Sequence, residues 1–371
     1  MSERWTPLQQ LLESGVSQKV YTAAVALVGL KGELLWEGAA GRLSRDAQDA
    51  LVNMETVFDL ASLTKPLATA LALMVLAGRQ EVSLTTSLGQ VLPNDWLPPD
   101  KHGLTLGSIL THRSGLPAWR PFYREVLAAP APARPTLLER LAAAAPLEHV
   151  PATVTVYSDL GFMLLKAVVE HISGMRLNQF CQEEIYRPLG LNILGFIPLP
   201  KPAQAALTTE YPRYAATERG LIAGRTDAGE VHDENAWAAG GVAGQAGLFG
   251  PGREVFELVA CLYHAYGGDG VGPLTPDAAK HFLTVPPEAD RAYGFDTPSG
   301  TPATRAAGRY FSPNSVGHLG FTGTSFWLDL TTGLMVVLLT NRVHLGRDDK
   351  TKIAAFRPRF HEAASRALGF G

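Results

Sequence analysis

The sequence is poor in cysteine, since Cys181 and Cys261 are the only two among its 371 residues. They lie far apart and lack CxxC spacing, which excludes a disulfide framework and a thiolate metal site. We expect both to be small buried hydrophobic residues. The ten histidines include no HExxH pair, and the adjacent His232, Asp233 and Glu234 would point in different directions on a strand or a helix. The sequence therefore predicts neither a bound metal nor a cofactor.

The chain also lacks a charge excess and long hydrophobic runs. Its formal net charge is −3, and no run of Lys or Arg is long enough to bind the phosphates of nucleic acid. The most apolar windows, residues 23–30 and 66–77, are shorter than the roughly 18 to 20 residues of a membrane-spanning helix. The first residues show no apolar signal-peptide core. We therefore expect a globular cytoplasmic protein without a membrane anchor, and we leave its oligomeric state open.

Strand patterns are found near both ends of the sequence, and helix patterns fill the middle. Residues 23–30 and 33–36 flank the turn at Lys31-Gly32, and residues 324–330 and 334–341 form a second hairpin pattern. A short apolar segment covers residues 57–60. Helical periodicity predicts helices over residues 66–77, 108–111, 137–145, 160–172, 177–186, 254–266 and 350–368, the last with a kink at Pro358.

This order predicts an α/β fold with two domains. Residues 1–80 and 240–371 would form an antiparallel sheet flanked by helices, because strands from both termini must pair to bury their apolar faces. Residues 81–239 would form a mostly helical domain. We expect a functional site between the two.

One four-residue pattern, Ser62-Leu63-Thr64-Lys65, indicates nucleophilic chemistry. Pro66 lacks an N–H group and fits only the first turn of a helix, which places Ser62 at the helix N-terminus. Side chains three residues apart share one face, so the Lys65 amine can reach the Ser62 hydroxyl and take its proton. To act as a base near neutral pH, Lys65 needs a pKa lowered from about 10.4. A Ser N-cap followed by an exposed Lys is the structural alternative.

Four segments together resemble the serine β-lactamase and penicillin-binding protein superfamily, in its class C-like branch of D-Ala-D-Ala carboxypeptidases and esterases. Residues 58–65 (FDLASLTK) are similar to its first motif, and residues 110–117 (LTHRSGLP) to a segment of that branch. Residues 157–162 (YSDLGF) resemble its Y-x-N motif, and residues 317–324 (GHLGFTGT) the strand that carries K-T-G or H-x-G. Their order and spacing also fit. The resemblance implies the β-lactamase/transpeptidase fold.

The resemblance also implies roles for the matched residues. Ser62 would attack a carbonyl, Lys65 would hold and deprotonate its hydroxyl, and Tyr157 would relay the proton to the leaving group. The backbone N–H groups of Ser62 and Phe321 would bind the oxyanion, with His318-Leu319-Gly320 as the third motif. Residues 321–324, which resemble x-T-G-T, offer an alternative frame for that motif.

Two of the matched positions depart from the family pattern. His318 stands where a Lys or a strongly polar group helps to bind the substrate carboxylate, and Asp159 stands where Asn binds the acyl amide. A neutral His and an anionic Asp would both weaken attraction for an anionic substrate. Alternatively, Asp159 pairs with Lys65 or His318 and raises the pKa of its partner. Near this site we also expect a glycine-rich loop that contains Gln245, where many relatives carry His.

These observations predict a serine hydrolase that forms an acyl-enzyme on Ser62 and acts on a small ester, amide or D-amino-acid-containing substrate. A D-Ala-D-Ala carboxypeptidase or β-lactamase is the second interpretation, disfavoured by His318, Asp159 and the missing export signal. A non-catalytic scaffold of the same fold is the third. The sequence contains no G-x-S-x-G nucleophile elbow of an α/β-hydrolase.

Overall fold

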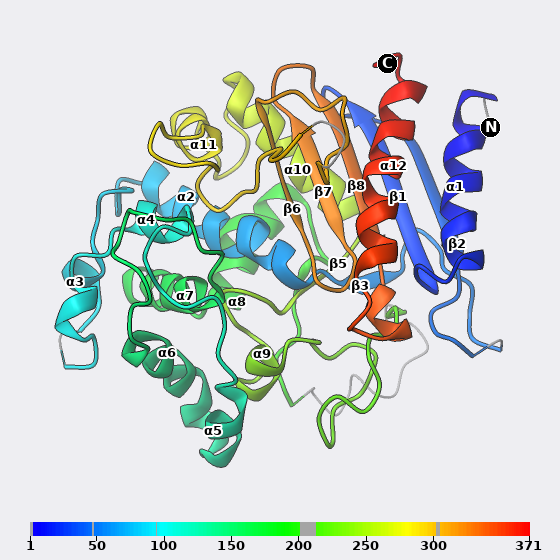
Figure 1. The fold of residues 1–371 in the computed structure, drawn as a ribbon. Coiled ribbons are helices and arrows are strands. Elements are labelled where there is room, and N and C mark those ends of the chain that lie inside the picture. Colours follow the sequence, from blue (N-terminus) through cyan, green and yellow to red (C-terminus); the bar gives the residue numbers. More distant parts are fainter. Residues whose placement is uncertain (1–2, 47, 94, 201–212, 302–304) are drawn as a thin grey trace.

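The computed structural model, which describes residues 3–46, 48–93, 95–200, 213–301 and 305–371, is built around a five-stranded antiparallel sheet (Figure 1). Its strand order is β2-β1-β8-β7-β6, so strands from the two ends of the chain pair in its centre. This confirms the predicted α/β class with an antiparallel sheet. The bounds are β1 (Ala23–Leu30), β2 (Glu33–Gly41), β6 (Ser315–Leu319), β7 (Ser325–Asp329) and β8 (Leu334–Thr340).

Helices cover both faces of this sheet. Two helices from opposite ends of the chain, α1 (Thr6–Ser17) and α12 (Thr351–Ala367), lie side by side on one face, where Leu12 and Phe360 are buried (Figure 1). On the other face, α10 (Gly252–Gly267) packs against β1 and β8. The alternating burial of Ala24 and Val25 in separate clusters follows from the two-residue period of a strand.

Some predicted boundaries were wrong. Strand β2 continues from the expected residue 36 to Gly41, because half-buried residues keep pairing with β1 beyond a register shift at Val28/Gly29. The second hairpin is confirmed, as is the C-terminal helix, which contains Pro358. A smaller three-stranded sheet, β3 (Val57–Asp59), β5 (Leu248–Pro251) and β4 (Gly195–Phe196), lies at the N-terminal end of the Ser62 helix.

The middle of the chain is mostly helical, as expected, and it packs beside the sheet (Figure 1). Its cluster of buried residues is continuous with the α10 side of the sheet. The division at residues 80 and 240 stays a prediction. The α-helices of this middle region are α3 (Leu88–Val91), α4 (Leu106–Leu110), α5 (Tyr123–Ala128), α6 (Arg134–Ala144), α7 (Asp159–Ser173), α8 (Leu177–Phe180) and α9 (Glu234–Ala238). A later helix, α11 (Pro276–Leu283), follows α10 in the sequence.

The helix that carries the Ser62 motif crosses the interior. It begins with a 3₁₀ turn, η2 (Ala61–Leu63), continues as a π-helical turn, η3 (Lys65–Ala70), and ends as α2 (Leu71–Gly78). By length and composition the run Ala61–Gly78 would be apolar enough to cross a membrane, but 83% of it is buried in the protein, as in a core helix. Pro66 lies in the first turn of η3, where its missing N–H group leaves no hydrogen bond unmade.

Candidate active site

Ser62 lies on a tight turn that directs its side chain into a cleft. The preceding residue, Ala61, has a φ of 49°, a left-handed conformation that costs a non-glycine residue energy. The buried carboxylate of Asp59 holds this turn, since it accepts hydrogen bonds from the N–H groups of Ala61 at 2.8 Å and His232 at 2.7 Å. The sequence motif thus has a structural reason for its Asp, which sequence reasoning had not identified.

Lys65 is fully buried and reaches Ser62, as the spacing predicted. Its Nζ lies 3.1 Å from Ser62 Oγ, 3.2 Å from the backbone oxygen of Gln245 and 2.7 Å from Asp159 Oδ1. Three acceptors therefore surround the three protons of an ammonium group. The alternative of an exposed Lys behind a Ser N-cap was wrong.

Lys65 does not have the lowered pKa that it would need to act as a base near neutral pH. Burial lowers the pKa of Lys65, but the negative charge of Asp159 and the neighbouring Tyr157 outweigh burial and raise that pKa above its ordinary value. Lys65 is therefore a cation in the free protein at neutral pH. The Asp159–Lys65 pair that the sequence left open is the one found.

Tyr157 lies beside this pair, two residues before the start of α7. Its ring centre is 4.8 Å from Lys65 Nζ and 4.5 Å from the ring of His112. Desolvation by the surrounding protein raises the pKa of Tyr157 to about 12, although the positive charge of Lys65 opposes this rise. Tyr157 is therefore a neutral hydroxyl group at neutral pH, which can relay a proton by giving up its own while it accepts another.

His112 orients the Tyr157 segment, a role that its place in the LTHRSGLP segment did not reveal. Its Nδ1 accepts a hydrogen bond from the N–H of Ser158 at 3.0 Å, and Ser158 in turn caps the N-terminus of α7. Burial lowers the pKa of His112 well below its ordinary value, so the ring stays neutral and can accept this bond. A backbone-to-ring contact of this kind has no sequence signature.

His318 on β6 forms the opposite wall of the cleft. It is buried, its Nδ1 lies 2.9 Å from the backbone oxygen of Leu319, and its ring centre is 5.9 Å from that of Tyr157. Burial lowers the pKa of His318, although Asp296 acts in the opposite direction. The ring is neutral at pH 7.5, as first expected, and no ion pair joins it to Asp159.

Gly320 and Phe321 follow β6 at the mouth of the cleft. A Cβ atom on Gly320 would lie 1.9 Å from Thr324 Oγ1 and 2.8 Å from the backbone oxygen of Leu60, so this position requires glycine. Within the described part of the chain, the backbone N–H groups of Ser62 and Phe321 donate no hydrogen bond. Both remain free to bind an oxyanion.

The geometry favours His318-Leu319-Gly320 over residues 321–324 as the third motif. His318 faces the cleft, whereas Thr322 is buried and donates a hydrogen bond to the backbone oxygen of Asp59 at 2.8 Å. Thr324 similarly donates to the backbone oxygen of Leu60 at 3.1 Å. The two threonines therefore fasten the turn after β6 to the Ser62 turn.

The cleft has a volume of about 390 Å³, and its rim carries cations that sequence reasoning missed. Arg342 Cζ and Lys350 Nζ both lie 4.8 Å from the ring centre of Phe321, and the Phe321 ring also stacks on the ring of His232 at 5.7 Å. Arg357 from α12 also lines the cleft. Arg342, Lys350 and Arg357 come from the part of the chain after β8, which carries no recognisable motif. Ser62, Tyr157, His318, Gly320 and Phe321 line the same cleft.

Gln245 and Asp233 form a second layer behind Lys65. Gln245 Nε2 donates to Asp233 Oδ1 at 3.2 Å, while its backbone oxygen accepts from Lys65. Burial and the nearby charge of Asp159 raise the pKa of Asp233 to about 7. The glycine-rich loop thus approaches the cleft, as expected, but it contributes a backbone atom.

The side chains of His232, Asp233 and Glu234, the adjacent residues that could have been metal ligands, each have a different partner. His232 pairs with Glu218 at 2.9 Å, Asp233 caps α9, and Glu234 pairs with Arg347 at 2.8 Å. Among the described residues, no group of three or more His, Cys, Asp or Glu side chains could hold a metal ion. Cys181 is a buried free thiol, as expected, whereas Cys261 is only half-buried.

Comparison with known proteins agrees with this arrangement. Residues 8–357 match the protein family described as Beta-lactamase. An Escherichia coli (strain K12) protein named "Putative D-alanyl-D-alanine carboxypeptidase" is 30% identical over 90% of this chain and 82% of its own length. A protein of the same name from Salmonella agona (strain SL483) is 32% identical over 80% of this chain and 72% of its own length.

A solved structure shares the fold over nearly the whole chain. EstCE1, described as a hydrolase with promiscuous acyltransferase activity, superposes with a TM-score of 0.72 at 22% identity. The match covers 97% of this chain and 98% of that one. The agreement extends to both the sheet and the helical region.

Proposed function

Because this chain belongs to the β-lactamase family of serine hydrolases, we propose that it hydrolyses a small ester, amide or D-amino-acid-containing substrate through an acyl group on Ser62. The observation that supports this most is the contact of 3.1 Å between Ser62 Oγ and the buried Lys65 Nζ. Ser62 and Phe321, whose backbone N–H groups donate no hydrogen bond to any described residue, line the same cleft. A nucleophile, a proton-handling pair and an oxyanion site are what acyl transfer requires.

The charges assign separate tasks to Lys65 and Tyr157. Lys65 is already protonated, so it holds Ser62 Oγ and stabilises negative charge on that oxygen. As the bond between Ser62 Oγ and the carbonyl carbon forms, the Tyr157 oxygen accepts the Ser62 proton while Tyr157 gives its own proton to the leaving group, so Tyr157 stays neutral as the old acyl bond breaks. Water then attacks the acyl carbon, passes a proton through Tyr157 to Ser62 Oγ, and releases the acid. This sequence returns every group to its starting state.

Turnover of p-nitrophenyl acetate by wild type and Ser62→Ala tests the proposal. We expect turnover to fall to the background level in Ser62→Ala and to persist in Ser83→Ala, a substitution at an exposed loop residue. Equal turnover in wild type and Ser62→Ala would contradict acyl transfer on Ser62. It would favour the third interpretation, a non-catalytic scaffold.

A D-Ala-D-Ala carboxypeptidase is the second candidate, favoured by the names of the curated relatives and by Arg342 and Lys350 at the cleft. These cations could attract the terminal carboxylate of a peptide. Release of D-alanine from diacetyl-Lys-D-Ala-D-Ala would support it, and turnover of a chromogenic cephalosporin would support a β-lactamase. We expect neither to match ester turnover, because the neutral His318 replaces the cationic Lys of the third motif.

A further inference from the structure

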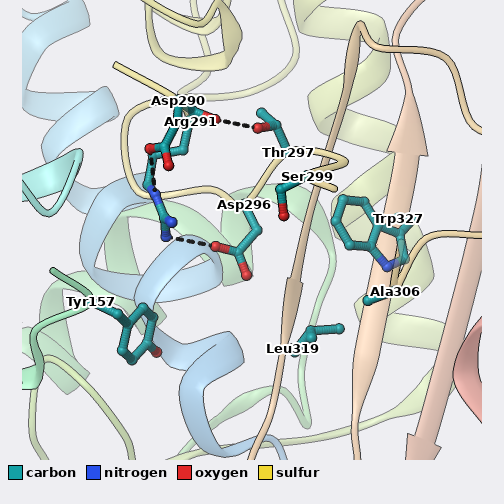
Figure 2. Close-up of a pocket in the computed structure, with 9 residues that line it drawn as sticks. All are labelled: Tyr157, Asp290, Arg291, Asp296, Thr297, Ser299, Ala306, Leu319 and Trp327. Atoms are coloured by element: carbon teal, nitrogen blue, oxygen red, sulfur yellow. Dashed lines mark hydrogen bonds and ion pairs between the residues drawn. The ribbon is translucent and has the colours of Figure 1, made fainter. Parts of the chain in front are cut away.

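A second cavity continues the catalytic cleft beyond Tyr157 (Figure 2). It has a volume of about 270 Å³. Tyr157, Asp296 and Leu319 line both the cavity and the cleft, so the two spaces meet at these residues. A substrate that reacts at Ser62 can therefore extend past Tyr157 into this cavity.

Asp296 is held rigidly at the junction. Its backbone exchanges two hydrogen bonds with Gly317 of β6, at 2.8 and 2.9 Å, one residue before His318. Its Oδ1 lies 2.9 Å from Arg291 Nη1, and Arg291 Nε lies 3.2 Å from Asp290 Oδ1 (Figure 2). The Asp296 side chain remains 24% exposed.

The cavity carries one uncompensated negative charge. Among the described residues that line it, Arg291 is the one cation, against the two carboxylates of Asp290 and Asp296. The catalytic cleft next to it has Arg342, Lys350 and Arg357 on its wall. The two connected spaces therefore differ in sign, and a charged substrate group will be drawn to one of them.

Trp327 on β7 supplies a second, independent polar group to the cavity. It is only 2% exposed, and its indole Nε1 has no hydrogen-bond partner in the part of the chain that the structure describes. Figure 2 shows this nitrogen turned toward Ala306 and Leu319, two of the residues that line the cavity. A buried N–H group without an acceptor is costly, and an oxygen atom of a ligand would satisfy it.

We propose that this cavity is a leaving-group subsite for a primary amine, with the ammonium at Asp296 and an oxygen of the same group at the Trp327 N–H. The inference rests on the proposed function, in which the leaving group is the part of the substrate that receives a proton from Tyr157. An ester R–CO–OR′ whose R′ group carries the ammonium and a second oxygen would thus lose the amino alcohol R′OH after the acyl group moves to Ser62. Water would complete the hydrolysis to the acid.

Three matched acetate esters test the inference on the full-length enzyme. They are 5-aminopentyl, n-hexyl and 5-carboxypentyl acetate, whose leaving groups are similar in length and differ in terminal charge. We expect kcat/KM for the aminopentyl ester to exceed that for the hexyl ester by about tenfold, as a hydrogen bond between charged groups provides. Higher kcat/KM for the carboxypentyl ester would overturn the inference and favour the carboxypeptidase candidate.

Single substitutions test which side chain causes the preference for the aminopentyl ester. In Asp296→Asn the ratio of aminopentyl to hexyl kcat/KM should fall to about one, whatever the absolute rates, because only the charge is removed. Asp277→Asn, an exposed carboxylate on α11, is the matched control and should keep the ratio. Trp327→Phe keeps an aromatic ring and should leave the ratio unchanged, because neither leaving group carries a second oxygen for the Trp327 N–H group. An unchanged ratio in Asp296→Asn would contradict the subsite.

Binding to the inactive Ser62→Ala protein separates this inference from the proposed function. Calorimetry should show 5-amino-1-pentanol binding about tenfold more tightly than 1-hexanol. If no ester is hydrolysed but this difference is present, the hydrolase proposal fails and the amine subsite stands. If p-nitrophenyl acetate is turned over but neither the alcohols nor the esters differ, the hydrolase proposal stands and the amine subsite fails.

Discussion

The helical wall of the cleft is charged and the strand wall is neutral, yet the two walls meet at the same nucleophile. On the helical wall, Lys65 and Asp159 form an ion pair of 2.7 Å beside Ser62. On the strand wall, His318 is a neutral ring followed by the free N–H group of Phe321. The charges of the first wall compensate each other, so they handle protons without attracting a charged substrate.

This difference changes the interpretation of Asp159. The sequence suggested that an anionic Asp159 would repel anionic substrates, but its partner Lys65 neutralises that charge. Charge selectivity therefore has to come from groups further out, which are Arg342 and Lys350 at one side and Asp296 at the other. The inner walls support chemistry, and the outer groups select substrates.

Removing the cation of the helical wall should have the largest effect. Lys65→Met takes away the group that holds Ser62 Oγ, and we expect kcat/KM to fall by about 10³-fold. It also leaves Asp159 without its partner and should lower the free energy of unfolding by about 3 kcal/mol. Ester kinetics and urea unfolding measure the two effects.

Lys166→Met is the matched control for that variant. Lys166 is another buried lysine, paired with Glu139 at 2.6 Å and Glu170 at 2.9 Å. We expect a comparable loss of stability but kcat/KM within about threefold of wild type, since Lys166 does not line the cleft. Similar kinetic losses in both variants would mean that Lys65 acts only through stability.

Removing the proton relay should have the next largest effect. Tyr157→Phe keeps the ring between Lys65 and His112 but removes the hydroxyl, and kcat/KM should fall by about 10²-fold. Tyr186→Phe is the control, because Tyr186 is buried and donates to the backbone oxygen of Leu67 at 2.9 Å. Full activity in Tyr157→Phe would show that another group moves the proton.

Neutralising Asp159 should shift the pH dependence more than the maximal rate. Asp159 raises the pKa of both Lys65 and Tyr157, so Asp159→Asn should let both groups lose protons at lower pH. Because the proposed mechanism needs Lys65 and Tyr157 in their protonated forms, we expect the alkaline fall of kcat/KM to move down by about one pH unit or more. Asn also restores the family residue, and acylation by a fluorescent penicillin should become faster. An unshifted profile would contradict the importance of the ion pair.

The smallest predicted effect is on how the free energy of unfolding depends on pH, through Asp233 behind the helical wall. The pKa of Asp233 is raised to about 7 by burial and by Asp159, while Glu234 acts in the same direction and Lys65 opposes it. A raised pKa means that the stability contributed by protonated Asp233 is lost as pH rises through 7. Between pH 5.5 and 8 this loss is about 2 kcal/mol in urea unfolding.

Asp233→Asn should remove that pH dependence. Asn remains a good N-cap for α9, so the helix end itself is kept. The variant should show a flatter curve of unfolding free energy between pH 5.5 and 8 than wild type. An equally steep curve in the variant would assign the pH dependence to another group.

Much of the fold was predictable because its signals are local. The helix start at Ser62 follows from Pro66, and the β7–β8 hairpin follows from alternation around Gly333, whose φ is 78°. The extension of β2 to Gly41 was missed because pairing with β1, not local pattern, decides where the strand ends. The π-helical turn at Lys65 was missed for a similar reason, since its surroundings in the core determine it.

The site was predictable where side chains carry it and unpredictable where the backbone does. Ser62, Tyr157 and His318 converge on one cleft, as their motifs indicated. The backbone oxygen of Gln245 reaches Lys65, but any residue type could supply that atom. The raised pKa of Lys65 depends on a distance to Asp159 that sequence spacing does not give.

Intact-mass spectrometry of the protein after rapid mixing with p-nitrophenyl acetate tests the central role of Ser62 most directly. The account predicts a mass increase of one acetyl group, located on the peptide that contains Ser62, and no increase in Ser62→Ala. The adduct should decay in wild type as water completes the cycle. Turnover without any adduct in wild type, or an equal adduct in Ser62→Ala, would contradict acyl transfer on Ser62.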